Sequence, residues 1–180
     1  NAPLRIGIAG IGRMGQRHAL NLAHRTLGAQ LVAACSPVSS ELEWAKEKLN
    51  VKHLYRDYKE LLAHPGLDAV FLVTPTTLHA DQIIQGLQAG KHVFSEKPLA
   101  LNIPDCLKVE EEAAKFPKLK VMIGFVRRFD PSYREAHDKV TAGVIGRPFL
   151  VRSQTADQND PSGFFVRFAP TSGGAMVDMS

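Results

Sequence analysis

The chain has 180 residues, of which 44% are hydrophobic and 22% charged, a composition typical of one globular domain with room for part of a second. Its net charge is +4, but the basic residues are dispersed, so we expect no nucleic-acid partner, whose surface normally requires concentrated charge. No apolar run is long enough to span a bilayer and no basic-then-apolar leader is present, so we expect no membrane partner.

Short apolar runs alternate with helical patterns through the first two-thirds of the chain. Strands are predicted at residues 4–10, 29–36, 53–55, 68–74, 91–95 and 120–125. Helices are predicted at residues 13–25, 77–90 and 103–115. Two more are predicted to begin at a capping box formed by Ser40 and Glu43 and after a cap at Asp57. Continuous apolar strands between amphipathic helices indicate a parallel sheet covered on both faces. With right-handed crossovers, this predicts an α/β, doubly wound Rossmann fold.

The pattern changes near residue 126, where we place a boundary between domains at 1–125 and 126–180. Asp130 is predicted to cap a helix that Pro131 begins. Residues 143–148 are predicted to form a turn, and residues 149–155 a strand with one solvent-exposed face. We expect this second domain, the start of an α+β domain, to be incomplete, because one helix and one strand make a poor core.

Two cysteines, Cys35 and Cys106, lie in apolar surroundings without the spacing of metal ligands. We interpret them as reduced thiols of a cytoplasmic protein and predict no metal site.

A G-x-G-x-x-G motif joins the first predicted strand to the first helix. In such a loop Gly10 allows the tight turn, Gly12 lets the backbone approach a pyrophosphate, and Gly15 permits close helix packing. The loop, with Arg13 and Met14 between its glycines, is therefore predicted to bind a dinucleotide at the positive end of the helix. A glycine-rich turn without a ligand is the alternative.

The second predicted strand ends at Ser36, where an NAD-specific site usually has an acidic residue. A serine does not repel a 2′-phosphate, and Arg13 lies in the glycine loop close to the same region. The sequence therefore predicts NAD or NADP as the cofactor and slightly favours NADP. Arg13 could instead be a solvated residue at the start of the helix.

Glu96, Lys97 and Pro98 follow the fifth predicted strand, at the sheet edge where doubly wound folds bind ligands. A lysine there, partly desolvated and near a cationic nicotinamide, could exchange a proton with a substrate hydroxyl. Pro98 would fix the backbone that follows Lys97, and the Lys97–Pro98 peptide bond could be cis. Taken alone, a lysine before a proline is more often a surface residue.

Four segments of the chain resemble one family. They are, in chain order, AGIGRMG, TPTTLHADQIIQGLQAGKHVFSEKPLA, GFVRRFDPSY and SGGAMVDMS. Together they resemble the glucose-fructose oxidoreductase and inositol 2-dehydrogenase (Gfo/Idh/MocA) family, and the third is most similar to its inositol dehydrogenase branch. The resemblance implies NAD(P)-dependent oxidation of a hydroxyl on a cyclitol or sugar, or the reverse reduction, with a homo-oligomer formed by the full-length protein.

The resemblance also implies roles for individual residues. Lys97 would transfer a proton and bind substrate, Asp178 would assist catalysis and bind substrate, and Arg127, or else Arg128, would reach substrate oxygens. Residues beside the cofactor would be Thr74, Pro75, Thr76, His79 and Glu96. His79 could instead be a helix residue satisfied by the backbone, and one of the two arginines could be a surface residue.

The sequence departs from the family pattern at three places, of which Ser36 in place of the usual acid is the first. Where family members that act on inositol tend to have a histidine and an asparagine, this chain has Gln154, Asp157, Gln158 and Asn159. The histidine that in the family follows the aspartate by four positions, on the same helix face, would fall beyond Ser180. We therefore expect a fragment of a longer protein that binds cofactor better than it turns over substrate.

Two other functions stay open. One is a dinucleotide-sensing regulatory protein of the same fold without catalysis, and the other is a truncated interaction module that binds neither cofactor nor substrate. Lys97 and Asp178 favour the enzyme, because a sensor has no need of a lysine and a carboxylate that converge on the nicotinamide.

Overall fold

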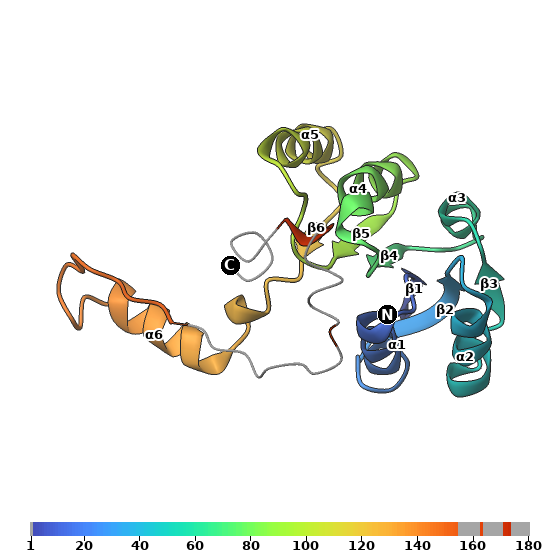
Figure 1. Ribbon diagram of the computed structural model, residues 1–180, viewed down its shortest axis with the longest axis horizontal. Coiled ribbons are helices and arrows are strands. Elements are labelled where there is room, and N and C mark those ends of the chain that lie inside the picture. The colour runs from blue at the N-terminus through green and yellow to red at the C-terminus, as the bar shows by residue number, and fades with distance from the viewer. Residues whose placement is uncertain (1, 155–162, 164–170, 174–180) are drawn as a thin grey trace. The chain divides into compact units, whose positions relative to one another are not determined.

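The computed structural model describes residues 2–154, 163 and 171–173 (Figure 1). The chain divides into two compact units, Asn1–Gly124 with Thr171–Ser180, and Phe125–Pro170. All strands of the described residues lie in the first unit.

The first unit is built on a parallel sheet that has six strands in the described part of the chain. They are β1 (Leu4–Ala9), β2 (Ala29–Cys35), β3 (His53–Tyr55), β4 (Ala69–Leu72), β5 (His92–Ser95) and β6 (Val121–Ile123). Their order is β3-β2-β1-β4-β5-β6, and every adjacent pair is parallel. The strand order reverses between β1 and β4, which makes the carboxyl end of this pair the switch point where doubly wound folds bind ligands.

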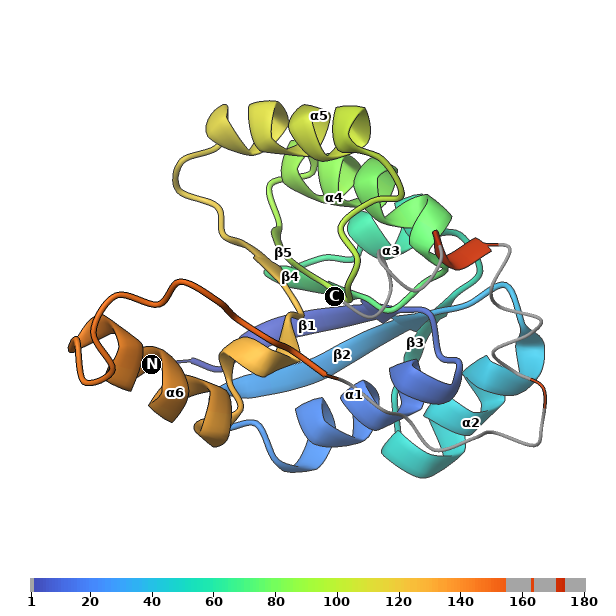
Figure 2. The same cartoon turned by 60° about the vertical axis from the view of Figure 1, so that its left-hand side comes forward.

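Helices connect the strands and cover both faces of the sheet. They are α1 (Arg13–His24), α2 (Ser39–Leu49), α3 (Tyr58–Leu62), the 3₁₀ turn η1 (Thr76–Leu78), α4 (His79–Gln88) and α5 (Ile103–Ala114). Figures 1 and 2 show α1 and α2 on one face and α3, α4 and α5 on the other, as right-handed crossovers require. The predicted doubly wound α/β fold is confirmed, with element ends displaced by no more than two residues.

Neighbouring residues of each central strand pack on opposite faces of the sheet. Ile8 of β1 belongs to a buried cluster with Ala19 of α1 and Ala45 of α2. The next residue, Ala9, belongs to the cluster on the other face, which includes Leu61 of α3 and Ile83 of α4. Full burial of each Ile or Leu stabilises the fold by about 1.5–3 kcal/mol. Both helix layers are thereby fixed to the sheet, and the loops at its carboxyl edge are held by rigid elements.

The start of α2 differs from the prediction, whereas that of α3 agrees with it. Ser40 lies inside α2, which has Val38 at its cap position and no side-chain hydrogen bond there. The predicted capping box is wrong because the Ser36 hydroxyl accepts the Val38 N–H at 3.1 Å, which forms the turn into the helix earlier. Asp57 caps α3 as predicted and accepts the Lys59 N–H at 2.7 Å.

The two cysteines are free thiols, and burial raises the pKa of Cys35 to about 12. None of the helices in the described residues combines the length and the apolar character that crossing a membrane requires.

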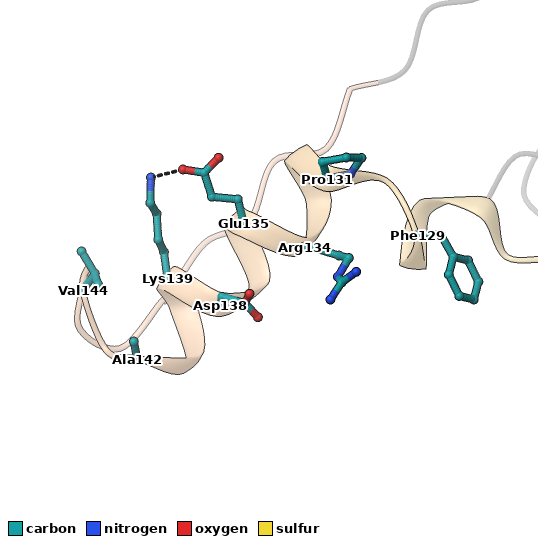
Figure 3. Close-up of a pocket in the computed structure, with 8 residues that line it drawn as sticks. All are labelled: Phe129, Pro131, Arg134, Glu135, Asp138, Lys139, Ala142 and Val144. Carbon is teal, nitrogen blue, oxygen red and sulfur yellow. Dashed lines mark hydrogen bonds and ion pairs between the residues drawn. The ribbon is translucent and has the colours of Figure 1, made fainter.

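The second unit contains the 3₁₀ turn η2 (Val126–Arg128) and helix α6 (Pro131–Thr141). The Asp130 carboxylate accepts the N–H of Ser132 at 2.9 Å, so the predicted cap of this helix is confirmed. Figure 3 shows Glu135 and Lys139 one turn apart on α6, joined by an ion pair of 2.6 Å. A shallow hollow along the helix is lined by Phe129, Pro131, Arg134, Glu135, Asp138, Lys139, Ala142 and Val144.

The turn predicted at residues 143–148 forms, but the strand predicted after it does not. Residues 149–154, the described part of that segment, have no strand structure. Phe149 is 99% exposed and Leu150 is 80% exposed, so neither packs against a neighbour. A strand needs the N–H and C=O groups of a second strand, which no described residue offers here. Alternation of apolar and polar residues is therefore not sufficient to form a strand in this segment.

Candidate functional site

Three glycines shape the loop between β1 and α1, and each is required for a different reason. Gly10 has a φ of +87°, and a Cβ there would overlap the carbonyl oxygen of Val73 in the loop after β4. A Cβ at Gly15 would overlap the carbonyl oxygen of Gly10. Among the residues that the structure describes, a Cβ at Gly12 would meet nothing closer than an oxygen of Glu41 at 3.8 Å. Two of the glycines therefore serve the fold, whereas the third leaves space above the loop.

The open space over Gly12 lies at the beginning of a long helix. Gly12 occupies the cap position of α1 and, having no side chain, offers no side-chain cap to the first turn. Arg13 and Met14 form the exposed start of that turn, which contains no acidic residue. Because the first N–H groups of a helix lack partners within it, they attract phosphate oxygens. The loop thus fits the pyrophosphate of the dinucleotide that the motif predicts.

Ser36, expected beside the adenosine ribose, lies at the end of β2 with its side chain turned inward. Its hydroxyl donates to Glu41 Oε2 at 2.5 Å and accepts from the Val38 N–H at 3.1 Å. The slight preference for NADP rested on Ser36, which does not repel a 2′-phosphate, and on Arg13 nearby; the Ser36 hydroxyl is buried and therefore does not face a phosphate. Glu41 was missed by sequence reasoning, although an acidic residue five positions after the strand end was visible.

Thr74, Pro75 and Thr76 form the loop after β4, directly beside the glycine loop. The Thr74 hydroxyl donates to Gln82 Oε1 at 2.6 Å, and Thr76 is buried at the start of η1. Pro75 is the exposed member of the three. The loop is therefore anchored by its two threonines.

His79 connects the loop after β4 to the loop after β5. Its ring is buried, with Nδ1 at 2.8 Å from the carbonyl oxygen of Pro98 and Nε2 at 2.9 Å from that of Thr74. Both ring nitrogens face backbone oxygens, so none is turned toward a cofactor. The structure thus supports the alternative in which His79 is satisfied by the backbone.

The loop after β5 carries Glu96 and Lys97, and His18 of α1 reaches it. Glu96 Oε1 accepts from His18 Nε2 at 2.7 Å, and Oε2 accepts from the Lys97 N–H at 3.1 Å. Burial alone raises the pKa of Glu96, but the two hydrogen bonds and the charges of His18 and Lys97 outweigh it and lower the pKa. The Lys97–Pro98 peptide bond is cis, as the sequence suggested.

His18 is a second residue that sequence reasoning missed. Its ring lies 5.5 Å from that of Phe94, which fixes it against β5 while its Nε2 reaches Glu96. Its position one helical turn after Gly15 was the available signal, because a side chain there points along the start of α1. His18 therefore links the glycine loop's helix to the Lys97 loop.

Arg127 lies in the second unit, in η2. Its Nη1 donates to the Tyr133 hydroxyl at 3.0 Å, and its guanidinium carbon lies 5.0 Å from the centre of that ring. Arg128 lies 5.9 Å from the ring centre of Phe125. A role for Arg127 at the substrate stays a prediction. Further predicted positions lie outside the described residues: Asp157, Gln158, Asn159 and Asp178.

Comparison with known proteins agrees with these motifs. The family model described as an oxidoreductase family with an NAD-binding Rossmann fold, GFO_IDH_MocA, matches residues 4–125. The chain belongs to the Gfo/Idh/MocA oxidoreductase family. The resemblance drawn from the four segments is confirmed.

Individual members of the Gfo/Idh/MocA family show how far the likeness extends. The chain is 38% identical to a scyllo-inositol 2-dehydrogenase (NAD(+)) of Bacillus subtilis over 177 residues, which are 98% of this chain and 51% of the relative. It is 37% identical to a myo-inositol 2-dehydrogenase of Thermotoga maritima, with 98% and 52% covered. A structure of scyllo-inositol dehydrogenase from Lactobacillus casei with bound NAD(H) and scyllo-inositol matches with 45% identity and a TM-score of 0.78, covering 80% and 42%. The chain thus spans about half the length of the curated relatives it matches.

Three loops of this Gfo/Idh/MocA chain meet at the carboxyl edge of the sheet. The loop after β1 packs against the loop after β4 where Gly10 adjoins Val73. The loop after β5 is held from both sides, by the ring of His79 and by the pair of His18 and Glu96. The glycine loop and the loop that carries Lys97 are therefore held along one edge of the sheet, the edge at which doubly wound folds bind ligands.

Proposed function

We propose that the protein containing this chain is an NAD(P)-dependent oxidoreductase that moves a hydride between nicotinamide and the hydroxyl- or carbonyl-bearing carbon of a cyclitol or sugar. The observation that carries this proposal is the pair of loops at one sheet edge, one open over Gly12 and one holding Lys97. The substrate class follows the relatives named as inositol dehydrogenases. Within that class inositol is the first substrate to test, because the sequence departs from the family's inositol pattern at Gln154 and the positions after it.

When bound, the nicotinamide supplies the site that takes or gives the hydride. Lys97 Nζ receives the proton of the substrate hydroxyl during oxidation and returns it when a carbonyl is reduced. Glu96 holds the backbone N–H of Lys97, so that loop does not have to reorganise during the reaction. Asp178 assists Lys97 by orienting the substrate hydroxyl, and Arg127 binds further substrate oxygens.

The glycine loop holds the pyrophosphate through the backbone around Gly12, with Arg13 and Met14 at the start of α1. Thr74, Pro75 and Thr76 line the nicotinamide side. We further propose a cytoplasmic protein, in keeping with its free thiols. We also propose that the full-length protein forms a homo-oligomer, as the family resemblance implies.

Titration with NADH and with NADPH, followed by nicotinamide fluorescence, tests the first half of the proposal. Binding of at least one of them is expected, and an unchanged signal with both would leave only the reading as an interaction module. Hydride transfer by the protein that contains this chain, measured by NADH absorbance with a panel of cyclitols and sugars, tests the second half. A dinucleotide-sensing regulator would bind cofactor and transfer no hydride with any member of the panel.

A further inference from the structure

The hydroxyl of Ser36 is used entirely inside the protein. The residue is 1% exposed, and its only hydroxyl proton is donated to Glu41 Oε2. Its hydroxyl oxygen accepts the N–H of Val38, and its backbone N–H donates to the Tyr55 carbonyl at 3.1 Å, continuing the pairing of β2 with β3. Ser36 is therefore a buried support, and a ribose at this edge would meet a different side chain.

Glu41 is the side chain that Ser36 supports. It lies in the first turn of α2 and is half-buried, with Oε2 held by the Ser36 hydroxyl. Its second oxygen, Oε1, lies 3.8 Å from the position that a Cβ on Gly12 would occupy. Among the described residues outside the loop itself, no other atom lies within 4 Å of that position. The carboxylate thus borders the open space over the glycine loop.

A carboxylate in this place has a definite effect on cofactor choice. In a doubly wound site the pyrophosphate lies over the second glycine, and the adenosine ribose follows toward the end of the second strand. There a carboxylate oxygen accepts hydrogen bonds from ribose hydroxyls, whereas a 2′-phosphate would bring negative charge against it.

We propose that Glu41, oriented by Ser36, binds the adenosine ribose and selects NAD over NADP. The inference rests on the proposed function, because it concerns the same dinucleotide site, and it reverses the slight preference for NADP that Ser36 suggested. The acidic residue usual at the end of the second strand is here supplied from the first turn of the following helix.

The test is the ratio of the dissociation constants of NADPH and NADH, measured by fluorescence titration of the chain. Wild type is expected to bind NADH more tightly. Glu41→Gln keeps the shape of the side chain but removes its charge, so the ratio should fall by roughly tenfold or more, the scale of one charge contact in a partly solvated site. Ser36→Ala frees the carboxylate from its support, so the ratio should fall by a smaller factor, about threefold.

Glu47→Gln is the matched control, because it removes the same charge from an exposed position later on α2. It should leave the ratio unchanged, and circular dichroism should show the same fold for all variants. A ratio that Glu41→Gln alters no more than Glu47→Gln does would overturn the inference while cofactor binding stands. A larger change in the ratio for Ser36→Ala than for Glu41→Gln would assign cofactor selection to Ser36 and also overturn the inference. Absence of binding by wild type would instead refute the proposed function.

Discussion

Replacement of Gly12 by alanine should separate cofactor binding from folding. In the described part of the chain, a Cβ at this position meets only an oxygen of Glu41 at 3.8 Å, and the backbone, at φ −71° and ψ −166°, is accessible to any residue. Alanine is a poorer cap than glycine by about 0.5–1 kcal/mol. It also restricts the unfolded chain, which offsets about 0.4–1 kcal/mol. The free energy of unfolding of Gly12→Ala should therefore stay within about 0.5 kcal/mol of wild type.

The same methyl group occupies the space over which the pyrophosphate is proposed to pass. Displacing a phosphate oxygen from one backbone N–H forfeits a hydrogen bond to a charged group, about 1.5–3 kcal/mol. NADH binding by Gly12→Ala should accordingly weaken by roughly tenfold to a hundredfold. Urea unfolding gives the stability and fluorescence titration gives the affinity. Unchanged NADH affinity in a stable Gly12→Ala protein would show that the cofactor does not approach this glycine.

Gly15→Ala is the companion variant, because its Cβ would overlap the carbonyl oxygen of Gly10. Backbone atoms cannot rotate away as a side chain can, so we expect a loss of about 2–3 kcal/mol after the gain in helix propensity of about 1 kcal/mol. Wild-type stability of Gly15→Ala would refute the steric reasoning for the loop.

Three further predictions concern other groups of the first unit. Lys97→Met should keep NADH affinity within about threefold and lower hydride transfer in the protein that contains this chain by roughly a hundredfold or more, as stopped-flow absorbance can show. The pKa of Glu96 is lowered from its ordinary value of 4.5, so Glu96 stabilises the fold above pH 4.5 and this stabilisation is lost as the pH falls through the folded-state pKa. Glu96→Gln should therefore flatten this part of the pH dependence of urea unfolding. Burial, followed by the charges of His53, Arg5 and Lys91, lowers the pKa of His64 from 6.5. The free energy of unfolding should therefore fall as the pH drops below 6.5, and an unchanged pH dependence in His64→Gln would contradict this.

The parallel, doubly wound sheet follows from features that the sequence carries locally. Continuous apolar strands and the helices between them define the two layers, and handed crossovers leave few alternatives for their arrangement. The reasons for Gly10 and Gly15 were equally predictable, because close backbone approach is a property of the motif itself. The strand at residues 149–155 was not, because pairing depends on a partner segment that alternation does not reveal.

Side-chain reach explains the two site residues that were missed. His18 contacts Glu96 across 78 positions of sequence, so the contact exists only after α1 has packed on the sheet and its His18 ring has reached Phe94 of β5. Glu41 contacts Ser36 across a turn whose first hydrogen bond, to the Val38 N–H, is made by Ser36 itself. Residue type and position mark both residues as candidates, but each contact requires knowledge of which way a helix enters the site.

The position of Glu41 has a consequence for reading cofactor preference from the end of the second strand. The usual rule assigns NAD or NADP by the residue type at that end, and here it finds Ser36. A short buried hydroxyl can instead hold a longer carboxylate from the next helix, whose second oxygen borders the space over Gly12. The same negative charge then reaches the ribose from a different part of the backbone. A serine at this position should therefore be taken to favour NADP only when no acidic residue follows in the first turn of the next helix.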